Sequence, residues 1–195
     1  MPLSLLILVA AIQGLTEFLP VSSSVHLVLI PIVTDFAYQG RVIDVAAHVG
    51  TLIAVAFYLR AEIIAIAVAM LRFGRTDPDH ARLGIMLVLA TIPVIIAGYI
   101  VNYANWQWLD MVYSLAIANL VFAVILWFAD KVPATRRDLG QIRLPHALII
   151  GIVQICALIP GASRSGVTMS AARFLSYDRV TAARFSLLLS LPTIA

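Results

Sequence analysis

The sequence predicts an all-α polytopic integral membrane protein, in which an inverted-topology repeat brings two broken, re-entrant helices to a central site. Three observations lead to this prediction. The composition is strongly apolar, long runs carry no charged residue, and two polar clusters each follow an apolar segment that ends at proline. Together they predict polar groups enclosed within a membrane domain.

The composition excludes a water-soluble fold. Hydrophobic residues make up 62% and charged residues 12% of the 195 residues, and the mean hydropathy is +1.01. Soluble domains carry about 25% charged residues. Basic residues that orient the chain in the membrane explain the net charge of +3, so we expect no nucleic-acid partner. Cys156 stands alone in an apolar run, which predicts a packed thiol.

Charge-free apolar runs locate the membrane spans. The runs 83–101 and 112–129 contain 19 and 18 residues, close to the ~20 that cross a bilayer core. No Lys or Arg precedes the N-terminal run 1–16, so we expect it to be retained rather than cleaved as a secretory signal. The runs 45–59 and 63–71 are shorter, which leaves their depth open and makes a partial or interfacial position an alternative for one of them.

Basic residues in two short loops set the predicted orientation. Seven of the thirteen Lys and Arg residues lie in loops 72–82 and 130–143. Two spans separate these loops, so both lie on one side, and the positive-inside rule makes that side cytoplasmic. The segment between the spans has Tyr103, Trp106 and Trp108 but no Lys or Arg, as expected of an outer loop with interfacial aromatic residues.

The chain resembles itself at an offset of 140 residues. This offset aligns Leu8 with Leu148, Ile12 with Ile152, Pro20 with Pro160, and Ser23 with Ser163. An odd number of spans between two copies inverts one copy relative to the other, so that their broken helices meet near the midplane.

This repeat defines the expected organisation of the chain. Residues 1–195 form a single transmembrane domain, in which the first repeat starts in 1–72, two long spans occupy 83–129 and the second repeat occupies 145–195. The second repeat stops within an apolar run, so we expect the natural chain to be longer at its C-terminus.

Two polar clusters follow the helical segments and hold the candidate chemistry. The first reads Gln13-Gly-Leu-Thr-Glu-Phe-Leu-Pro-Val-Ser-Ser-Ser-Val-His26, and the second reads Pro160-Gly-Ala-Ser-Arg-Ser-Gly-Val-Thr168. Irregular backbone cannot face lipid, so both clusters must lie inside the protein or beside a water-filled cavity. Ionisable groups are costly at that depth and are usually functional. We therefore expect Arg164 to pair with Glu17 or with an anionic ligand.

The second cluster is typical of a phosphate cradle. A guanidinium presents a planar fork of donors that suits phosphate oxygens, and glycines let backbone amides approach an anion closely. The candidate phosphate-binding residues are Gly161, Ser163, Arg164, Ser165, Gly166 and Thr168.

The first cluster predicts a nucleophile and its base. If the chain is helical after the proline, Ser22 and Ser23 lie about one turn from His26 on the same face, and a hydroxyl beside a base can act as a nucleophile. Glu17 follows Gln13 by four residues. It serves as a base, orients His26 or helps to hold a divalent cation, and the sequence leaves these alternatives open.

Other interpretations of these residues are purely structural. Serines after proline often cap helices, and a buried Glu–Arg pair is often only a structural ion pair. Asp44 and His48 share one helix face, and we keep them as candidates for metal binding or for supporting the site. A histidine on an apolar helix is nevertheless more often a packing residue.

The paired motifs resemble the two signatures of the bacterial undecaprenyl-diphosphate phosphatases, the bacitracin-resistance (BacA) family. The first signature is Glu17-Phe-Leu-Pro-Val-Ser-Ser with His26 nearby, and the second is Pro160-Gly-Ala-Ser-Arg-Ser-Gly. The resemblance covers essentially the whole chain. It implies a hydrolase of phosphorus-containing anhydrides that converts undecaprenyl diphosphate to undecaprenyl phosphate and inorganic phosphate. That reaction recycles the lipid carrier for peptidoglycan synthesis in the cytoplasmic membrane and confers bacitracin resistance.

The resemblance also implies roles for individual residues. It gives Glu17 and His26 acid–base roles. It places Ser22 and Ser23 at the reacting phosphorus, with Ser23 as the candidate nucleophile and water as the alternative. It makes Arg164 the clamp on the phosphate.

A divalent cation, Mg²⁺, is the implied cofactor, and polyprenyl diphosphate and membrane lipids are the implied partners, while a homodimer stays open. Two positions depart from the family pattern, because Gln13 replaces a common glutamate and Val25 replaces a common glycine. The glutamine puts metal binding at its position in doubt.

Competing classes make different demands on these residues. A polyprenyl-phosphate flippase could use the same inverted repeat and cradle without hydrolysis, but it needs no nucleophile. The acid-phosphatase-like lipid phosphatases use a histidine after their Ser-Arg pair, and none follows Arg164. A purely structural membrane protein has no need of Glu, His, Arg and several hydroxyls beside two helix breaks.

Overall fold

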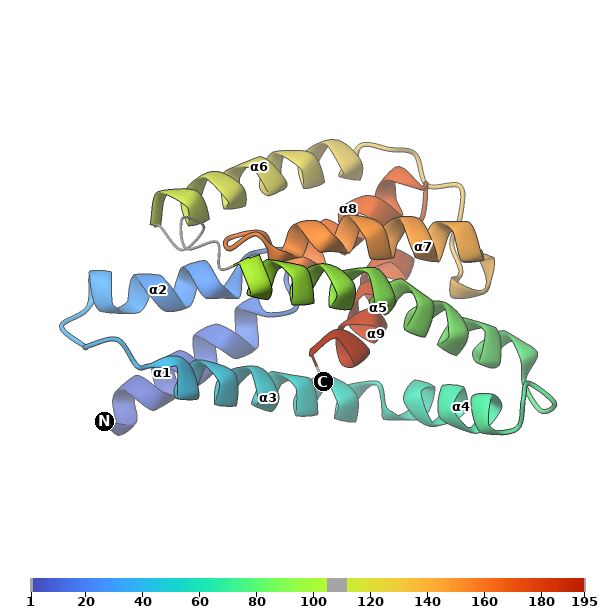
Figure 1. The fold of residues 1–195 in the computed structure, drawn as a ribbon, viewed down its shortest axis with the longest axis horizontal. Helices are drawn as coiled ribbons and strands as arrows, with labels where there is room; N and C mark the ends of the chain where they lie inside the picture. Colours follow the sequence, from blue (N-terminus) through green and yellow to red (C-terminus); the bar gives the residue numbers. More distant parts are fainter. Residues whose placement is uncertain (1, 105–111, 195) are drawn as a thin grey trace.

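The computed structural model describes residues 2–104 and 112–194, and this part of the chain is helical without strands (Figure 1). In chain order, the elements are α1 (Leu3–Thr16), α2 (Ser23–Val33), α3 (Arg41–Tyr58), α4 (Arg60–Leu71), α5 (Pro78–Ala104), α6 (Val112–Asp130), the 3₁₀ turn η2 (Leu139–Gln141), α7 (Leu144–Val153), the 3₁₀ turn η3 (Gln154–Leu158), α8 (Arg164–Phe174) and α9 (Arg179–Ile194). This confirms the predicted all-α fold.

Three helices in the described part of the chain are long and apolar enough to cross a membrane. These are Arg41–Tyr58, Pro78–Tyr103 and Tyr113–Asp130, in α3, α5 and α6. The two runs that the sequence predicted as spans within 83–129 therefore form helices of sufficient length and hydropathy to cross a membrane. The run 45–59, whose depth the sequence left open, belongs almost entirely to α3, and α4 continues after the single residue Leu59. The chain is a polytopic membrane protein.

The two repeats share one arrangement. In the first, α1 and α2 form a hairpin and α3 follows; in the second, α7 with η3 and α8 form a hairpin and α9 follows. In Figure 1, α1 and α7 approach the middle of the molecule from opposite ends, and α2 and α8 each return toward the end from which their hairpin entered. The prediction of two broken helices that meet in an inverted arrangement is confirmed.

Proline sets the helix breaks. Its ring clashes with a preceding helical turn and it offers no N–H to the helix ladder, so a helix rarely continues through it. In both hairpins the returning helix begins after a serine in extended conformation, Ser22 (φ −77°, ψ 112°) before α2 and Ser163 (φ −73°, ψ 120°) before α8. The two breaks therefore have the same local geometry at the start of the second helix.

The basic loops lie at one end of the molecule, which we call the basic end. Figure 1 shows the α4–α5 connection and the α6–α7 connection at the same end. Arg82 joins them, because its Nη2 donates to the carbonyl of Ile142 at 3.0 Å. The two loops thus lie together, and the face of the membrane that they occupy stays a prediction. The predicted aromatic loop lies mostly at residues 105–111, outside the described residues.

Helix α5 is the centre of the packing and contacts α4, α7 and α9. Gly151 on α7 lets the two backbones meet, because a Cβ at this position would lie 2.3 Å from the carbonyl oxygen of Ala90 on α5. A second cluster of Leu5, Val9, Leu27 and Ile30 holds the α1–α2 hairpin together. Large apolar side chains such as Ile95 and Ile117 are exposed and cover the surface that faces lipid.

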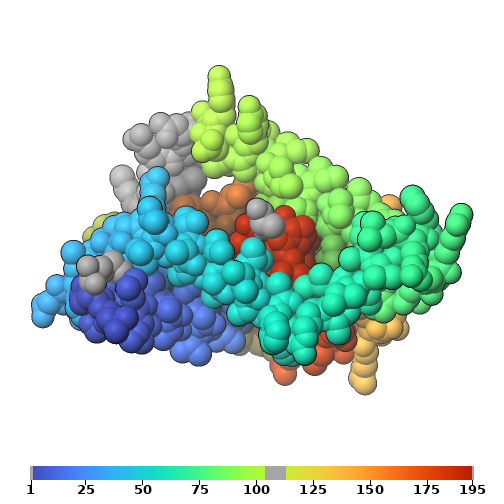
Figure 2. Space-filling model, turned by 90° about the horizontal axis from the view of Figure 1, so that it is seen from below, coloured from blue at the N-terminus to red at the C-terminus, as the bar shows by residue number. Residues whose placement is uncertain are grey.

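The space-filling view shows a hollow in this surface. In Figure 2, α9 lies at the floor of a hollow between α3 and α5.

Candidate active site

The two hairpin tips are joined by an ion pair. Glu17 caps the C-terminus of α1, and Arg164 is the first residue of α8. Nη2 of Arg164 donates to Oε1 of Glu17 at 2.6 Å, and the Glu17 side chain is 4% exposed. The pairing that the sequence predicted across 147 residues is confirmed.

The second oxygen of Glu17 gathers groups from the first repeat. Oε2 accepts hydrogen bonds from Nε2 of Gln13 and from Oγ of Ser23, both at 2.7 Å. Nε2 of His48 lies 3.4 Å from the same oxygen. A carboxylate that accepts a hydrogen bond from a serine hydroxyl is positioned to remove the hydroxyl proton when the serine attacks an electrophile.

Serine hydroxyls tie the two break loops together. Oγ of Ser165 donates to the carbonyl of Leu19 at 2.7 Å, so a hydroxyl from the second loop satisfies backbone in the first. Oγ of Ser163 accepts from the amide of Gly166 at 3.2 Å and thereby caps α8. Ser22 and Ser24 share a hydrogen bond of 2.9 Å between their hydroxyls.

A cavity of about 260 Å³ lies at this junction. It is lined by Glu17, Val21, Ser22, Ser23, Ser24, His48, Val94, Gln154, Ala157, Leu158, Ala162, Ser163, Arg164 and Thr193. The wall thus combines one carboxylate, one guanidinium, one imidazole and several hydroxyls with apolar side chains from α5 and η3. Such a wall can hold a phosphate group while the apolar part of a ligand lies among the helices.

Some predicted site residues do not line this cavity. Nδ1 of His26 donates to the backbone carbonyl of Ser22 at 2.7 Å, and no described hydroxyl bonds to its ring. Oγ1 of Thr168 lies 2.6 Å from Oγ of Ser186, within the packing of α8 and α9. Ser165 is engaged with Leu19, and Gly161 and Gly166 lie outside the cavity wall. Of the predicted phosphate-binding residues, Ser163 and Arg164 line the cavity.

The cavity wall contains a polar residue, Gln154, that was not among the site residues predicted from the sequence. Gln154 is fully buried at the start of η3, and its Nε2 donates to Oγ1 of Thr193 at 3.4 Å. Its Oε1 is buried without a hydrogen-bond partner among the described residues. The sequence does contain a signal that could have identified it, because Gln154 is the single side-chain amide in the apolar run 145–162 and comes shortly before the second helix break.

The predicted metal ligands do not form a magnesium site as they are arranged. Mg²⁺ prefers carboxylate and carbonyl oxygens in an octahedral set. Gln13 presents its amide nitrogen to Glu17, and both Glu17 oxygens already accept hydrogen bonds. Asp44 accepts from Tyr38 and Gln39, at 2.6 and 2.7 Å, and does not line the cavity. Residues 2–104 and 112–194 contain no cluster of three His, Cys, Asp or Glu side chains that could hold a metal.

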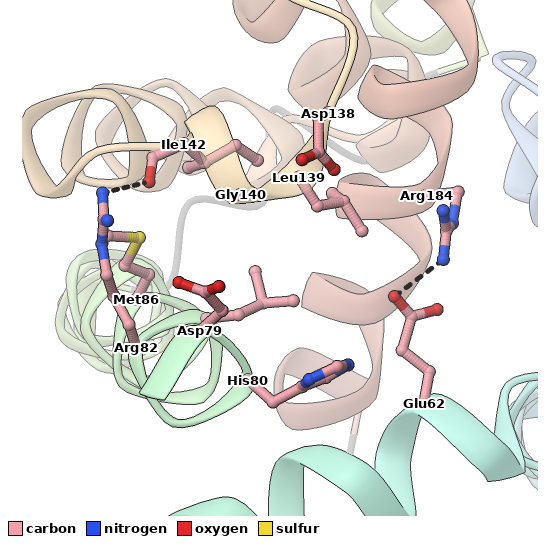
Figure 3. Close-up of a pocket in the computed structure, with 11 residues that line it drawn as sticks. Glu62, Asp79, His80, Arg82, Met86, Asp138, Leu139, Gly140, Ile142 and Arg184 are labelled. Carbon is pink, nitrogen blue, oxygen red and sulfur yellow. Dashed lines mark hydrogen bonds and ion pairs between the residues drawn. The ribbon is translucent and has the colours of Figure 1, made fainter. Parts of the chain in front are cut away.

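A second cavity, of about 210 Å³, lies at the basic end and shares no lining residue with the first (Figure 3). Its charged groups come from α4, α5, α9 and the α6–α7 connection. Arg184 donates to Glu62 at 3.0 Å, and Arg82 donates to the carbonyl of Ile142. His80 lines this cavity and lies 2.6 Å from Asp77. This cavity lacks a hydroxyl beside a base.

The fold and the central cavity define a class: a polytopic helical membrane protein whose inverted halves each contribute one broken helix to a site with paired acidic and basic groups. The family model described as Bacitracin resistance protein BacA matches residues 6–195. The chain belongs to this family.

Curated relatives agree with the family. A protein named undecaprenyl-diphosphatase from Dinoroseobacter shibae is 49% identical over 195 residues, which cover 97% of this chain and 72% of that protein. Proteins of the same name from Roseobacter denitrificans and Teredinibacter turnerae are each 47% identical, cover 97% and 96% of this chain, and are each covered to 72%. The similarity therefore includes both hairpins and the helices between them.

Proposed function

We propose that this chain hydrolyses undecaprenyl diphosphate to undecaprenyl phosphate and inorganic phosphate. One observation carries the proposal: Ser23, Glu17 and Arg164 line one cavity. There the Glu17 carboxylate accepts hydrogen bonds from the Ser23 hydroxyl and from the Arg164 guanidinium. The names of the relatives supply the substrate. No observation favours transport without hydrolysis, which would leave the Ser23–Glu17 contact without a purpose.

In the proposed mechanism, Oγ of Ser23 attacks the terminal phosphorus in line with the bridging oxygen, and the hydroxyl proton passes to Glu17. The bond from phosphorus to the bridging oxygen breaks, and undecaprenyl phosphate leaves with the electron pair. Water then attacks the phosphoserine, inorganic phosphate leaves, and the proton on Glu17 returns to Ser23. A guanidinium has five N–H donors, so Arg164 can hold Glu17 and still stabilise the transferring phosphoryl group.

The surroundings of the reaction follow from the same proposal. The prenyl chain lies among the apolar helices, and the protein resides in the bacterial cytoplasmic membrane with the basic end in the cytoplasm. A requirement for Mg²⁺ stays a prediction. When bound, a divalent cation would supply neutralisation of the diphosphate charge, but the described residues do not form a site for it, so no step of the mechanism above depends on it.

The test is release of inorganic phosphate from undecaprenyl diphosphate by detergent-purified protein, with Mg²⁺ or with a chelator. We expect release by the unaltered chain and loss of at least ~10²-fold in Ser23→Ala and Glu17→Ala, because these changes remove the nucleophile and its base. Ser4→Ala makes the same chemical change on the exposed part of α1 and should keep the full rate. A Ser23→Ala variant with undiminished release would exclude Ser23 as the nucleophile.

A further inference from the structure

The cavity wall holds a buried glutamine whose amide orientation follows from its hydrogen bonds. Nε2 of Gln154 donates to Oγ1 of Thr193 at 3.4 Å, and that hydroxyl donates its own proton to the carbonyl of Leu189 at 2.7 Å. The hydroxyl can therefore only accept from Gln154, so the amide nitrogen faces Thr193 and the amide oxygen, Oε1, does not. Oε1 is buried and has no hydrogen-bond partner among the described residues.

Of three such glutamines, Gln154 is the one that lines the central cavity. Oε1 of Gln13 and Oε1 of Gln39 are also buried without a partner in the described part of the chain. Their Nε2 atoms donate to the carboxylates of Glu17 and Asp44, both at 2.7 Å, and neither glutamine lines the cavity. A buried carbonyl without a partner is costly, so a donor that enters the cavity is favoured at Gln154.

The amide of Gln154 belongs to the apolar part of the wall. The other lining residues from η3 and α5 are Val94, Ala157 and Leu158. In the proposed function the prenyl chain lies among apolar helices, so undecaprenyl phosphate leaves toward this part. In-line displacement requires the water to attack phosphorus from the side that the leaving group occupied, opposite Oγ of Ser23. Gln154 offers that water an acceptor, because the Thr193 hydroxyl is already bonded to Leu189 and Gln154.

Resting on the proposed function, we propose that Gln154 is a catalytic residue that orients the water for hydrolysis of the phosphoserine. Oε1 accepts a hydrogen bond from one O–H of the water, which turns a lone pair of the water toward phosphorus. As the water oxygen bonds to phosphorus, the Ser23 Oγ–phosphorus bond breaks, and Oγ takes the proton that Glu17 holds. One water proton stays on the new P–OH group and the other passes to a second phosphate oxygen, so dihydrogen phosphate leaves. The amide stays neutral, as does the glutamine that orients water in GTPases.

The experiment follows the two products separately after detergent-purified protein is mixed with excess undecaprenyl diphosphate, and it measures phosphoserine at Ser23 by mass spectrometry. Gln154→Leu replaces the amide with an apolar group of similar size. Thr193→Val removes the hydroxyl that fixes the amide, and it supplies the test if Gln154→Leu does not fold. Thermal unfolding in detergent identifies the folded variants. Gln39→Leu is the matched control, because it removes a buried amide with an unpartnered oxygen outside the cavity.

We expect Gln154→Leu to release inorganic phosphate ~10²-fold more slowly, because the attacking water is no longer held in place. It should still release about one undecaprenyl phosphate per protein in a rapid first turnover and should accumulate phosphoserine. Thr193→Val should show the same pattern with a loss of roughly 10-fold, and Gln39→Leu should show neither effect.

Two results would overturn the inference while the proposed function stands. One is a folded Gln154→Leu variant that keeps the full rate of phosphate release. The other is a folded variant that slows both products equally and accumulates no phosphoserine, because the amide would then act before the water attacks. Absence of phosphate release from the folded, unaltered chain would instead overturn the proposed function itself.

Discussion

The two repeats share a backbone plan but contribute opposite chemistry to the site. The first repeat supplies a carboxylate, a hydroxyl and an imidazole to the cavity wall, as Glu17, Ser23 and His48, whereas the second supplies the guanidinium of Arg164. Neither repeat holds both the proposed proton acceptor and the proposed phosphate clamp. The inverted repeat therefore provides a scaffold in which two half-sites have specialised, and the site exists only where the hairpin tips meet.

The loops at the two helix breaks, residues 17–22 and 159–163, also differ in backbone conformation. At the offset of 140, Val21 aligns with Gly161. Gly161 has a φ of +92°, and a Cβ there would lie 2.3 Å from the carbonyl oxygen of Leu115 on α6. No non-glycine residue of the first break loop has a positive φ. The second tip is thus held against a neighbouring helix, while the first tip is held through the polar contacts of Glu17.

The largest effect should follow from removal of the cation in the second repeat. Arg164→Ala should lower kcat for phosphate release by about 10²–10³-fold, because it removes charge stabilisation of the transferring phosphoryl group and leaves Glu17 without its partner. Arg164→Lys should recover little of this loss, since an ammonium lacks the planar fork.

The control for this comparison is Arg179→Ala. Arg179 is exposed at the basic end, where it pairs with Asp130. An exposed pair contributes at most about 1 kcal/mol to stability, so release should stay within about twofold of the unaltered rate. Full activity in Arg164→Ala would show that the second repeat contributes only structure, and the proposed division of labour would be wrong.

A smaller effect should follow from loss of the glycine in the second tip. Gly161→Ala should lower stability by roughly 2–4 kcal/mol, because it combines a left-handed backbone with a clash against Leu115. Gly40→Ala is matched in backbone, with a φ of +88°, but its Cβ would meet no atom within 4 Å, so it should cost only about 1–2 kcal/mol. Thermal unfolding in detergent measures both. Equal shifts would mean that contact with α6 does not hold the second tip.

The smallest effect concerns the helices that follow the two hairpins. Asp178 accepts a hydrogen bond from the amide of Thr181 at 2.6 Å at the start of α9. That backbone hydrogen bond lowers the pKa of Asp178 below its ordinary value of 3.8. In the first repeat, the N-cap of α3 is Gly40, which has no side chain to cap the helix.

Asp178→Asn should therefore lower stability slightly, by about 1 kcal/mol or less at neutral pH. Because the folded pKa is lowered, the stability from the ionised carboxylate is fully present above about pH 5. It is lost as the pH falls below the unfolded value and through the folded one. The difference in unfolding temperature between the two proteins should shrink over that acidic range, and a difference independent of pH would contradict this account.

Features that depend on composition or on strong local signals could be predicted from the sequence. The two charge-free spans, the shared side of the basic loops and the helix breaks near Pro20 and Pro160 each follow from a local rule. The contact between Glu17 and Arg164 was also within reach, because two costly charges in an apolar protein need partners and the repeat suggested where they meet.

The remaining parts of the site depend on how distant elements face one another. Spacing along a helix puts His26 one turn from Ser22, but only the packing of α3 against the hairpin tips puts His48 beside Glu17. Gln154 and Thr193 meet in the cavity wall from η3 and α9, and no sequence period relates them. The run 45–59 looked short because Asp44 interrupts it, yet α3 continues to Arg41.

The opposite entry of the two hairpins means that one ion pair joins elements that come from opposite ends of the molecule. The α1 and α7 hairpins approach the middle from these two ends, and their leading helices contain 14 and 10 residues. A mismatch between helix length and hydrocarbon thickness is relieved by tilt and displacement of helices. We therefore expect the contact between Glu17 and Arg164 to respond to the acyl-chain length of the host membrane.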